Sequence, residues 1–318
     1  MPGTLGLDKG PVRVTIEQRF CYSPFPDKIA MSQKITVLAL VLFMLVPFAA
    51  QAQTDADKSD ESAQAQPQEP AKIVITPHRA IYNMTLGTVK NGSNISDVSG
   101  KMFFEWNDVC NGWAVQQHLE LKISYSEGDE TEISSAVVTW ESKDGKNYNF
   151  NVRRITNEKE TENYRGKATM EDQAGKVAYS IPKDKTMELP PGTIFPSLHT
   201  EFIIKKALAG EKLFTSKVFD GSDEEGLADV SSFIGPLQHE FQSTEMNPSL
   251  RDSALLKNPG WNVRLAFFKI KSETGEPDYE MNMSLLTNGV AKSMHIDYGD
   301  FSVTGVLESL EELPSPGC

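Results

Sequence analysis

The chain has 318 residues, of which 39% are hydrophobic, and a formal net charge of −13 at pH 7. This length suffices for one large domain or two small ones, and the hydrophobic content is that of an ordinary folded protein. The acidic charge argues against nucleic-acid binding and against long-range attraction to anionic lipid surfaces.

The N-terminal region predicts a secretory signal peptide. A short basic start is followed by an unbroken apolar run, Ile35–Val46, and by a small-x-small cleavage site, Ala50-Gln51-Ala52. The run is shorter than the about 20 apolar residues that span a membrane, so an uncleaved membrane anchor is the weaker alternative. We therefore expect a signal peptide over residues 31–52 and a non-native extension over residues 1–30. Removal of residues 1–52 changes the net charge from −13 to −15.

The next region predicts a disordered leader and then a β-sheet. Residues 53–72 are rich in Gln, Asp, Ala, Ser and Pro, a composition that cannot bury a core. From residue 73, short runs of alternating apolar and polar residues predict a meandering antiparallel sheet. The clearest pair of runs predicts a hairpin over Gly100–Tyr125. Asn111-Gly112 can supply the positive φ of its turn, which places Cys110 at the hairpin tip.

One helix is predicted, after the proline-rich corner Leu189–Pro196, over residues 197–209. Ser197 is expected to cap its start, and Gly210 to adopt the left-handed conformation at its end. Its apolar face is predicted to consist of Leu198, Phe202, Ile203 and Leu208. A helix that is apolar on one face packs against the sheet, so we expect it at the centre, between β halves at about residues 73–188 and 211–318.

The second half repeats the strand pattern. Strands are predicted over Leu227–Ile234 and Leu237–Phe241, and Asn288-Gly289 predicts a two-residue hairpin turn. Residues 243–260 are polar and contain two prolines, which predicts a loop with a helical turn. The last strand is expected to lead into an acidic tail, Glu308–Cys318.

Two cysteines, Cys110 and Cys318, follow the predicted signal peptide. Export brings them into an oxidising compartment, where a disulfide is the default state. A reactive thiol at Cys110 is the alternative. Such a thiol needs a basic or helix N-terminal setting, and Asp108 and Asn111 do not provide one.

Motifs for catalysis, metals and phosphates are weak. The chain has no G-x-S-x-G, H-E-x-x-H or Gly-rich phosphate loop. Ser197 and His199 could be imagined as nucleophile and base, but neighbours in a helix do not face each other. The five histidines, at positions 78, 118, 199, 239 and 295, lack ligand spacing, and Asp220–Glu225 lacks the pattern of a Ca²⁺ loop. We expect no catalytic, cofactor-binding or metal-binding residues.

A series of short motifs extends through residues 73–318. They are His78-x-x-x-Tyr82, Gly100–Trp106, Cys110-Asn111-Gly112-Trp113, Thr139-Trp140-Glu141-Ser142 with Asp144-Gly145, Leu189–Pro196 with His199-Thr200, and Phe219-Asp220-Gly221. In order and spacing they resemble the cell-envelope integrity protein B family of alphaproteobacteria. The resemblance implies a mainly β fold: a long antiparallel sheet coiled into a β-spiral of two unclosed barrel-like halves, with a central helix.

The resemblance also has functional implications. It implies a periplasmic, non-enzymatic factor that maintains the cell envelope together with a periplasmic tetratricopeptide-repeat protein, and a disulfide between Cys110 and Cys318. We expect an adaptor or scaffold. The first alternative is a carrier, because a wide unclosed barrel lined by Trp, Phe, Met and Leu can hold a hydrophobic ligand such as a lipid or lipoprotein acyl chain. A hydrolase of envelope polymers is the second alternative.

Overall fold

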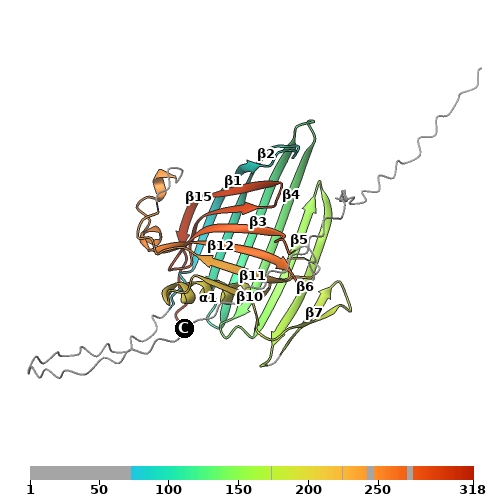
Figure 1. Cartoon of the computed structure of the whole chain (residues 1–318). Coiled ribbons are helices and arrows are strands. Elements are labelled where there is room, and N and C mark those ends of the chain that lie inside the picture. Colours follow the sequence, from blue (N-terminus) through green and yellow to red (C-terminus); the bar gives the residue numbers. More distant parts are fainter. Residues whose placement is uncertain (1–72, 173, 224, 242–246, 271–274) are drawn as a thin grey trace, which may run out of the picture. The chain divides into compact units, whose positions relative to one another are not determined.

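A computed structural model describes residues 73–318 except 173, 224, 242–246 and 271–274. The predicted signal peptide and leader lie outside the described residues. The described part is built on one 15-stranded sheet in the order β8-β7-β6-β5-β4-β3-β2-β1-β15-β14-β13-β12-β11-β10-β9 (Figure 1). The chain therefore forms a mainly β, nearly closed barrel with one seam, which confirms the predicted fold class.

The sheet has two arms that meet where β1 pairs with β15. The first arm contains β1 His78–Val89, β2 Ile95–Asp108, β3 Gly112–Tyr125, β4 Glu130–Ser142, β5 Asn147–Thr156, β6 Lys159–Met170, β7 Gly175–Ile181 and β8 Thr186–Leu189. The second arm contains β9 Thr193–Ile194, β10 Leu213–Phe219, β11 Leu227–Ile234, β12 Gly260–Lys269, β13 Tyr279–Leu286, β14 Ala291–Asp297 and β15 Phe301–Glu312. All neighbours are antiparallel except β9 and β10.

The predicted hairpin is present as β2 and β3, which pair from Asp108↔Trp113 to Ile95↔Tyr125. Its turn differs from the prediction, because the positive φ lies at Cys110, with φ 67°. Gly112 is instead needed for close packing. A Cβ there would lie 2.5 Å from the Trp140 indole nitrogen, so only glycine fits beneath this ring.

The seam between the two arms is packed with aromatic rings. Tyr148 on β5 stacks on Phe195, with ring centroids 4.9 Å apart, and meets Phe219 at the end of β10 edge-on at 6.2 Å. The Tyr148 hydroxyl donates a hydrogen bond to the backbone carbonyl of Asp220 at 3.0 Å. Since Tyr148 belongs to the first arm and Asp220 to the second, these contacts close the barrel where β8 and β9 do not pair.

The helix α1, Pro196–Leu208, is present, but its start and its buried face differ from the prediction. Pro196 occupies the first turn, and Ser197 lies inside the helix rather than capping it. The buried side chains are Ser197, His199, Ile203, Ile204 and Ala207. Leu208 is 48% exposed and Leu198 and Phe202 are half-buried. Of the predicted apolar face only Ile203 is fully buried, so the buried side of the helix is rotated from the predicted one.

The end of α1 follows the prediction. Gly210 has φ 77°, its N–H donates to the Ala207 carbonyl, and the N–H of Glu211 donates to the Lys206 carbonyl. This is the Schellman arrangement that a C-terminal glycine permits.

Two further segments differ from the prediction. Leu237–Phe241 forms no strand, and only Gln238 makes an isolated bridge, to Gly260. The expected loop that follows does contain helical turns, at Pro248–Leu250 and Ala254–Lys257. Glu308 to Glu312 continues β15 rather than starting a tail, because β1 supplies a full-length partner and Arg79 pairs with Glu311.

Candidate functional site

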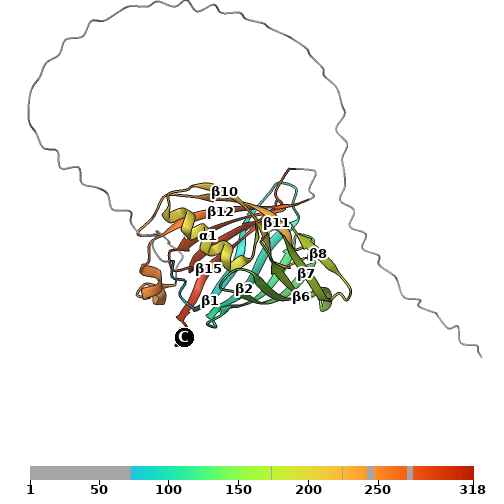
Figure 2. The ribbon, with the colours of Figure 1, turned by 90° about the horizontal axis from the view of Figure 1, so that it is seen from below.

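The helix α1 lies across one end of the curved sheet, as the view from below shows (Figure 2). Ile203, Ile204 and Ala207 pack in the same buried cluster as Trp106 and Trp113 of the first arm. The second arm contributes to this cluster with buried side chains from four strands, namely Val218, Val230, Ile234, Trp261, Val263, Leu265 and Leu285. The helix thus joins both arms and closes this end of the barrel.

The first anchor of α1 is the buried carboxylate of Glu141, the penultimate residue of β4. Its oxygens accept the backbone N–H groups of Ser197 and Leu198 at 2.7 and 2.8 Å. The helix has no side-chain cap of its own, so Glu141 takes that role from a different strand. Burial raises the pKa of Glu141 to about 7.

The second anchor joins the helix to the β2–β3 hairpin. The indole N–H of Trp113 donates to a carboxylate oxygen of Glu201 at 2.8 Å. The ammonium group of Lys143 lies over the same indole, 2.8 Å from the ring centroid, and pairs with Asp108 at 3.0 Å. These contacts connect the helix, the hairpin and the β4–β5 turn in one network.

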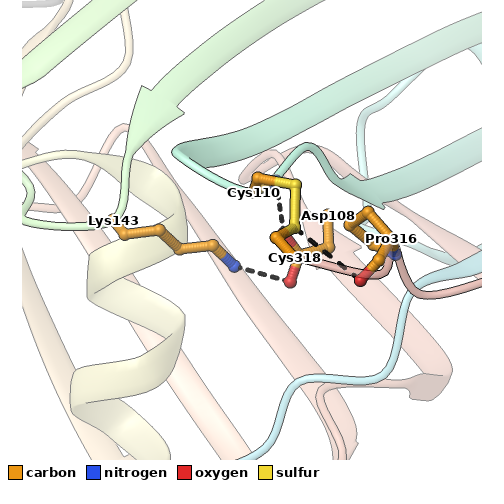
Figure 3. The surroundings of a disulfide bond; sticks show 5 residues. All are labelled: Asp108, Cys110, Lys143, Pro316 and Cys318. Atoms are coloured by element: carbon orange, nitrogen blue, oxygen red, sulfur yellow. Dashed lines mark hydrogen bonds and ion pairs between the residues drawn. A yellow bond between two sulfur atoms is a disulfide. The ribbon is translucent and has the colours of Figure 1, made fainter.

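A disulfide joins Cys110 at the hairpin tip to Cys318 at the same end of the molecule (Figure 3). The two Cα atoms are 5.9 Å apart, and 208 positions separate the cysteines in the sequence. Asp108 supports the tip, since one of its oxygens accepts the backbone N–H of Cys110 at 2.9 Å and the other pairs with Lys143. The bond ties the end of the chain to the hairpin, as the sequence predicts.

The residues considered for catalysis do not form a catalytic pair. The backbone N–H of Ser197 is bound by Glu141, and the Nε2 atom of buried His199 has no hydrogen-bond partner in the described part of the chain. Burial lowers the pKa of His199 to about 4, so the ring is neutral at pH 7. These contacts place Ser197 and His199 in the packing of α1 and do not join them to each other.

Other polar atoms are also buried near the helix-closed end. His78 bonds the Thr76 carbonyl through Nδ1, which leaves Nε2 as an acceptor without a partner within the described ranges. The nearby Trp106 indole N–H likewise has no partner there, and the two rings lie 6.3 Å apart. Among the described residues, no group of three or more His, Cys, Asp or Glu could hold a metal ion. In the acidic turn after β10, the side-chain carboxylate of Asp220 accepts the backbone N–H of Ser222.

The role of Glu141 was missed from the sequence. Glu141 belongs to the motif Thr139-Trp140-Glu141-Ser142, but the sequence sign of its role is its place in the β4 alternation. Ile133, Val137 and Thr139 face inward, and the same parity carries Glu141 into the interior. A charged residue at an inward position implies a buried partner, and here the partner is the start of α1.

Comparisons with known proteins place this architecture in a family. A family model described as EipB-like matches residues 69–314. The chain belongs to the EipB-like family. This confirms the family resemblance that the motifs of the sequence indicate.

Two relatives extend the comparison. The chain is 31% identical over 241 residues to the cell envelope integrity protein EipB of Brucella abortus (strain 2308), covering 75% of this chain and 85% of that protein. It also resembles the crystal structure of a β-barrel-like protein of a domain of unknown function from Brucella abortus. That match has a TM-score of 0.70 and 30% identity, and covers 76% of this chain and all of the other. A role in envelope integrity is therefore supported for the EipB-like chain. None of the helices in the described ranges has the length and apolar character to cross a membrane.

Proposed function

We propose that this EipB-like protein is a non-enzymatic periplasmic scaffold that maintains the cell envelope together with a periplasmic tetratricopeptide-repeat protein. The observation that carries the proposal is the fixed barrel end. The Cys110–Cys318 bond and the Glu141 and Trp113 hydrogen bonds hold the hairpin, the helix and the chain end in one arrangement. A pre-organised surface loses little conformational entropy on binding, as a scaffold requires.

A repeat protein suits this shape because its concave face accommodates a rigid β surface. The test is affinity capture from periplasmic extracts, with chemical cross-linking and a tagged chain that starts at Gln53. A repeat protein enriched over an unrelated periplasmic bait supports the scaffold. Recovery of lipid without any specific protein contradicts it in favour of a carrier.

The carrier is the second candidate, and one observation favours it. Several apolar side chains on the inward alternation of the strands are only half-buried. They are Val115, Leu119, Val137, Phe267 and Met281. An inner apolar surface that stays partly accessible suits an acyl chain. Native mass spectrometry of protein purified without detergent tests this role, since a carrier should retain acyl species that organic extraction removes.

A further inference from the structure

Exposed apolar side chains gather at the barrel end that α1 closes. Leu213 and Phe233 are 70% and 52% exposed, and they are direct partners in the β10–β11 register. Their chain neighbours, Phe214 and Ile234, are more buried, so this pair lies on the outer face of the sheet. Large apolar side chains that protrude as neighbours, rather than singly, indicate an interaction surface.

A second exposed pair lies close to the first along the chain. Val74 and Leu208, 61% and 48% exposed, line a shared hollow of about 350 Å³ with Thr287 and Asn288. The Schellman turn after α1 connects Leu208 to Leu213 within five residues. The carbonyl of Lys212 in turn accepts the N–H of Ile234, next to Phe233. We call Val74, Leu208, Leu213 and Phe233 the apolar rim.

Basic side chains accompany this rim in a chain that is acidic as a whole. Lys205, Lys212 and Lys257 are exposed, and none of them makes an ion pair in the described part of the chain. Lys205 and Lys212 flank Leu208 in the sequence, and Lys257 precedes Asn258, which lines the hollow. Glu211, which precedes Lys212 in the sequence, binds Lys206 at 2.8 Å. These three lysines therefore offer unpaired positive charge on a chain whose net charge is −13.

We propose that the apolar rim and these three lysines form a contact surface for the face of a lipid bilayer that carries anionic phospholipid. The amphipathic arrangement suits this occupant: apolar tips enter the boundary between headgroups and acyl chains, and ammonium groups bind phosphate at the same depth. The acidic remainder of the molecule repels the bilayer only within a Debye length of about 8 Å at physiological salt. Contact is consequently local, reversible and confined to the helix-closed end.

Vesicle co-flotation tests the proposal with the chain from Gln53 onward, which omits the apolar run Ile35–Val46. The described residues begin at Ile73, so this chain retains the whole barrel. The probes are vesicles of phosphatidylcholine alone and with about 30% phosphatidylglycerol. We expect binding to the anionic vesicles only, and weaker binding at high salt. Equal binding to both vesicles, or none to either, would overturn the proposal.

Two variants and a matched control locate the surface. Leu213→Thr with Phe233→Thr keeps residues of good strand propensity, and we expect it to weaken binding about tenfold. Lys205→Gln with Lys212→Gln should remove the preference for anionic vesicles. Val138→Thr alters another exposed apolar strand residue, 41% exposed on β4, and should bind like the parent. Circular dichroism and the melting temperature confirm that each variant is folded.

The same variants distinguish other occupants of the rim. Sedimentation that shows a dimer, dissociated by Leu213→Thr with Phe233→Thr, would overturn the lipid proposal in favour of a contact between copies. An equal loss of binding in Val138→Thr would show that vesicle binding is not specific to the rim and would also overturn it. These outcomes do not bear on the scaffold proposal, which is tested by capture of a repeat protein.

Discussion

Glu141 accepts the backbone N–H of Ser197 at 2.7 Å and so ties the end of β4 to the start of α1. A helix start carries several unpaired N–H groups and a partial positive charge. Most helices satisfy these groups with a local capping side chain, whereas here the cap comes from a strand 56 positions away. The position of the helix that closes the barrel therefore depends on one buried carboxyl group.

This contact predicts a pH-dependent stability. Burial raises the pKa of Glu141 to about 7, from an ordinary value of 4.5. Between these values the folded chain holds a proton that the unfolded chain has lost. The contribution of this group to the free energy of unfolding thus falls by about 3 kcal/mol as pH rises from 4.5 to 7. Glu141→Gln removes this titration but keeps that of His199. In urea unfolding, the free energy of unfolding of the variant should therefore rise relative to that of the parent as pH increases from 5 to 7.5. Parallel profiles would contradict the prediction.

His199 titrates in the opposite sense and provides an independent prediction. Burial lowers its pKa to about 4, so between pH 6.5 and 4 the unfolded chain binds a proton that the folded chain does not. The stability from this group is complete above pH 6.5 and is lost as pH falls, by about 2 kcal/mol at pH 5. The free energy of unfolding of His199→Leu, taken relative to that of the parent, should therefore be higher at pH 5 than at pH 7.5. A constant difference between variant and parent at both pH values would show that His199 does not titrate in this way.

The buried face of α1 can be checked with two matched substitutions. Ile203 is 2% exposed and packs in the cluster that joins both arms, whereas Leu208 is 48% exposed. Ile203→Gln should lower the free energy of unfolding by about 3 kcal/mol or more, because it removes apolar contacts and buries an amide. Leu208→Gln, with the same chemistry, should cost less than about 1 kcal/mol. Equal costs in chemical denaturation would mean that the burial pattern of the helix is wrong.

The strand pattern was largely predictable because period-two alternation is a local property. The β2–β3 hairpin and the Gly210 helix end depend on residues close in sequence, and the structure has them. Asn288 and Gly289 do join β13 to β14, but the loop has three residues rather than two, because the N–H of Leu286 donates to the Val290 carbonyl and only Gly289 has a positive φ. The buried face of α1 was not predictable in the same way. An amphipathic helix fixes its orientation by the partners it meets, and Ile204 and Ala207 become buried only because both arms of the sheet surround them.

The candidate site shows the same limit. The disulfide pair followed from the small number of cysteines and from the family resemblance. The contacts of Glu141 with Ser197 and of Trp113 with Glu201 join residues 56 and 88 positions apart in the sequence. A local sequence pattern does not reveal contacts between residues so far apart. Likewise, β15 extends to Glu312 because β1 lies beside it, although the acidic composition of that segment is typical of a tail.

The packing at the seam predicts that position 221 accepts only glycine. Gly221 has φ 68°, and a Cβ there would lie 2.7 Å from the ring of Phe150, which meets the seam residue Phe219 edge-on at 5.5 Å. Gly192 has a similar φ of 78°, but a Cβ there would meet open space. Both alanine variants incur backbone strain of about 1 kcal/mol, and only Gly221→Ala must also displace a packed ring. We expect a clearly lower melting temperature for Gly221→Ala than for Gly192→Ala. Equal melting temperatures would argue against tight packing at the seam.

The disulfide predicts that Cys110→Ser and Cys318→Ser act alike. Closing a loop of 208 positions removes unfolded-state entropy worth about 5 kcal/mol as an upper value, and either substitution forfeits this stabilisation. Lys143, Asp108 and the backbone contacts of the hairpin remain, so the barrel should still fold. We expect both single variants and the double variant to melt at the same reduced temperature. A reactive thiol at Cys110 would instead make Cys110→Ser the more harmful change in an envelope-integrity assay. Thiol labelling of denatured, unreduced parent protein is the direct measurement, and two free thiols per mature chain would refute the bond.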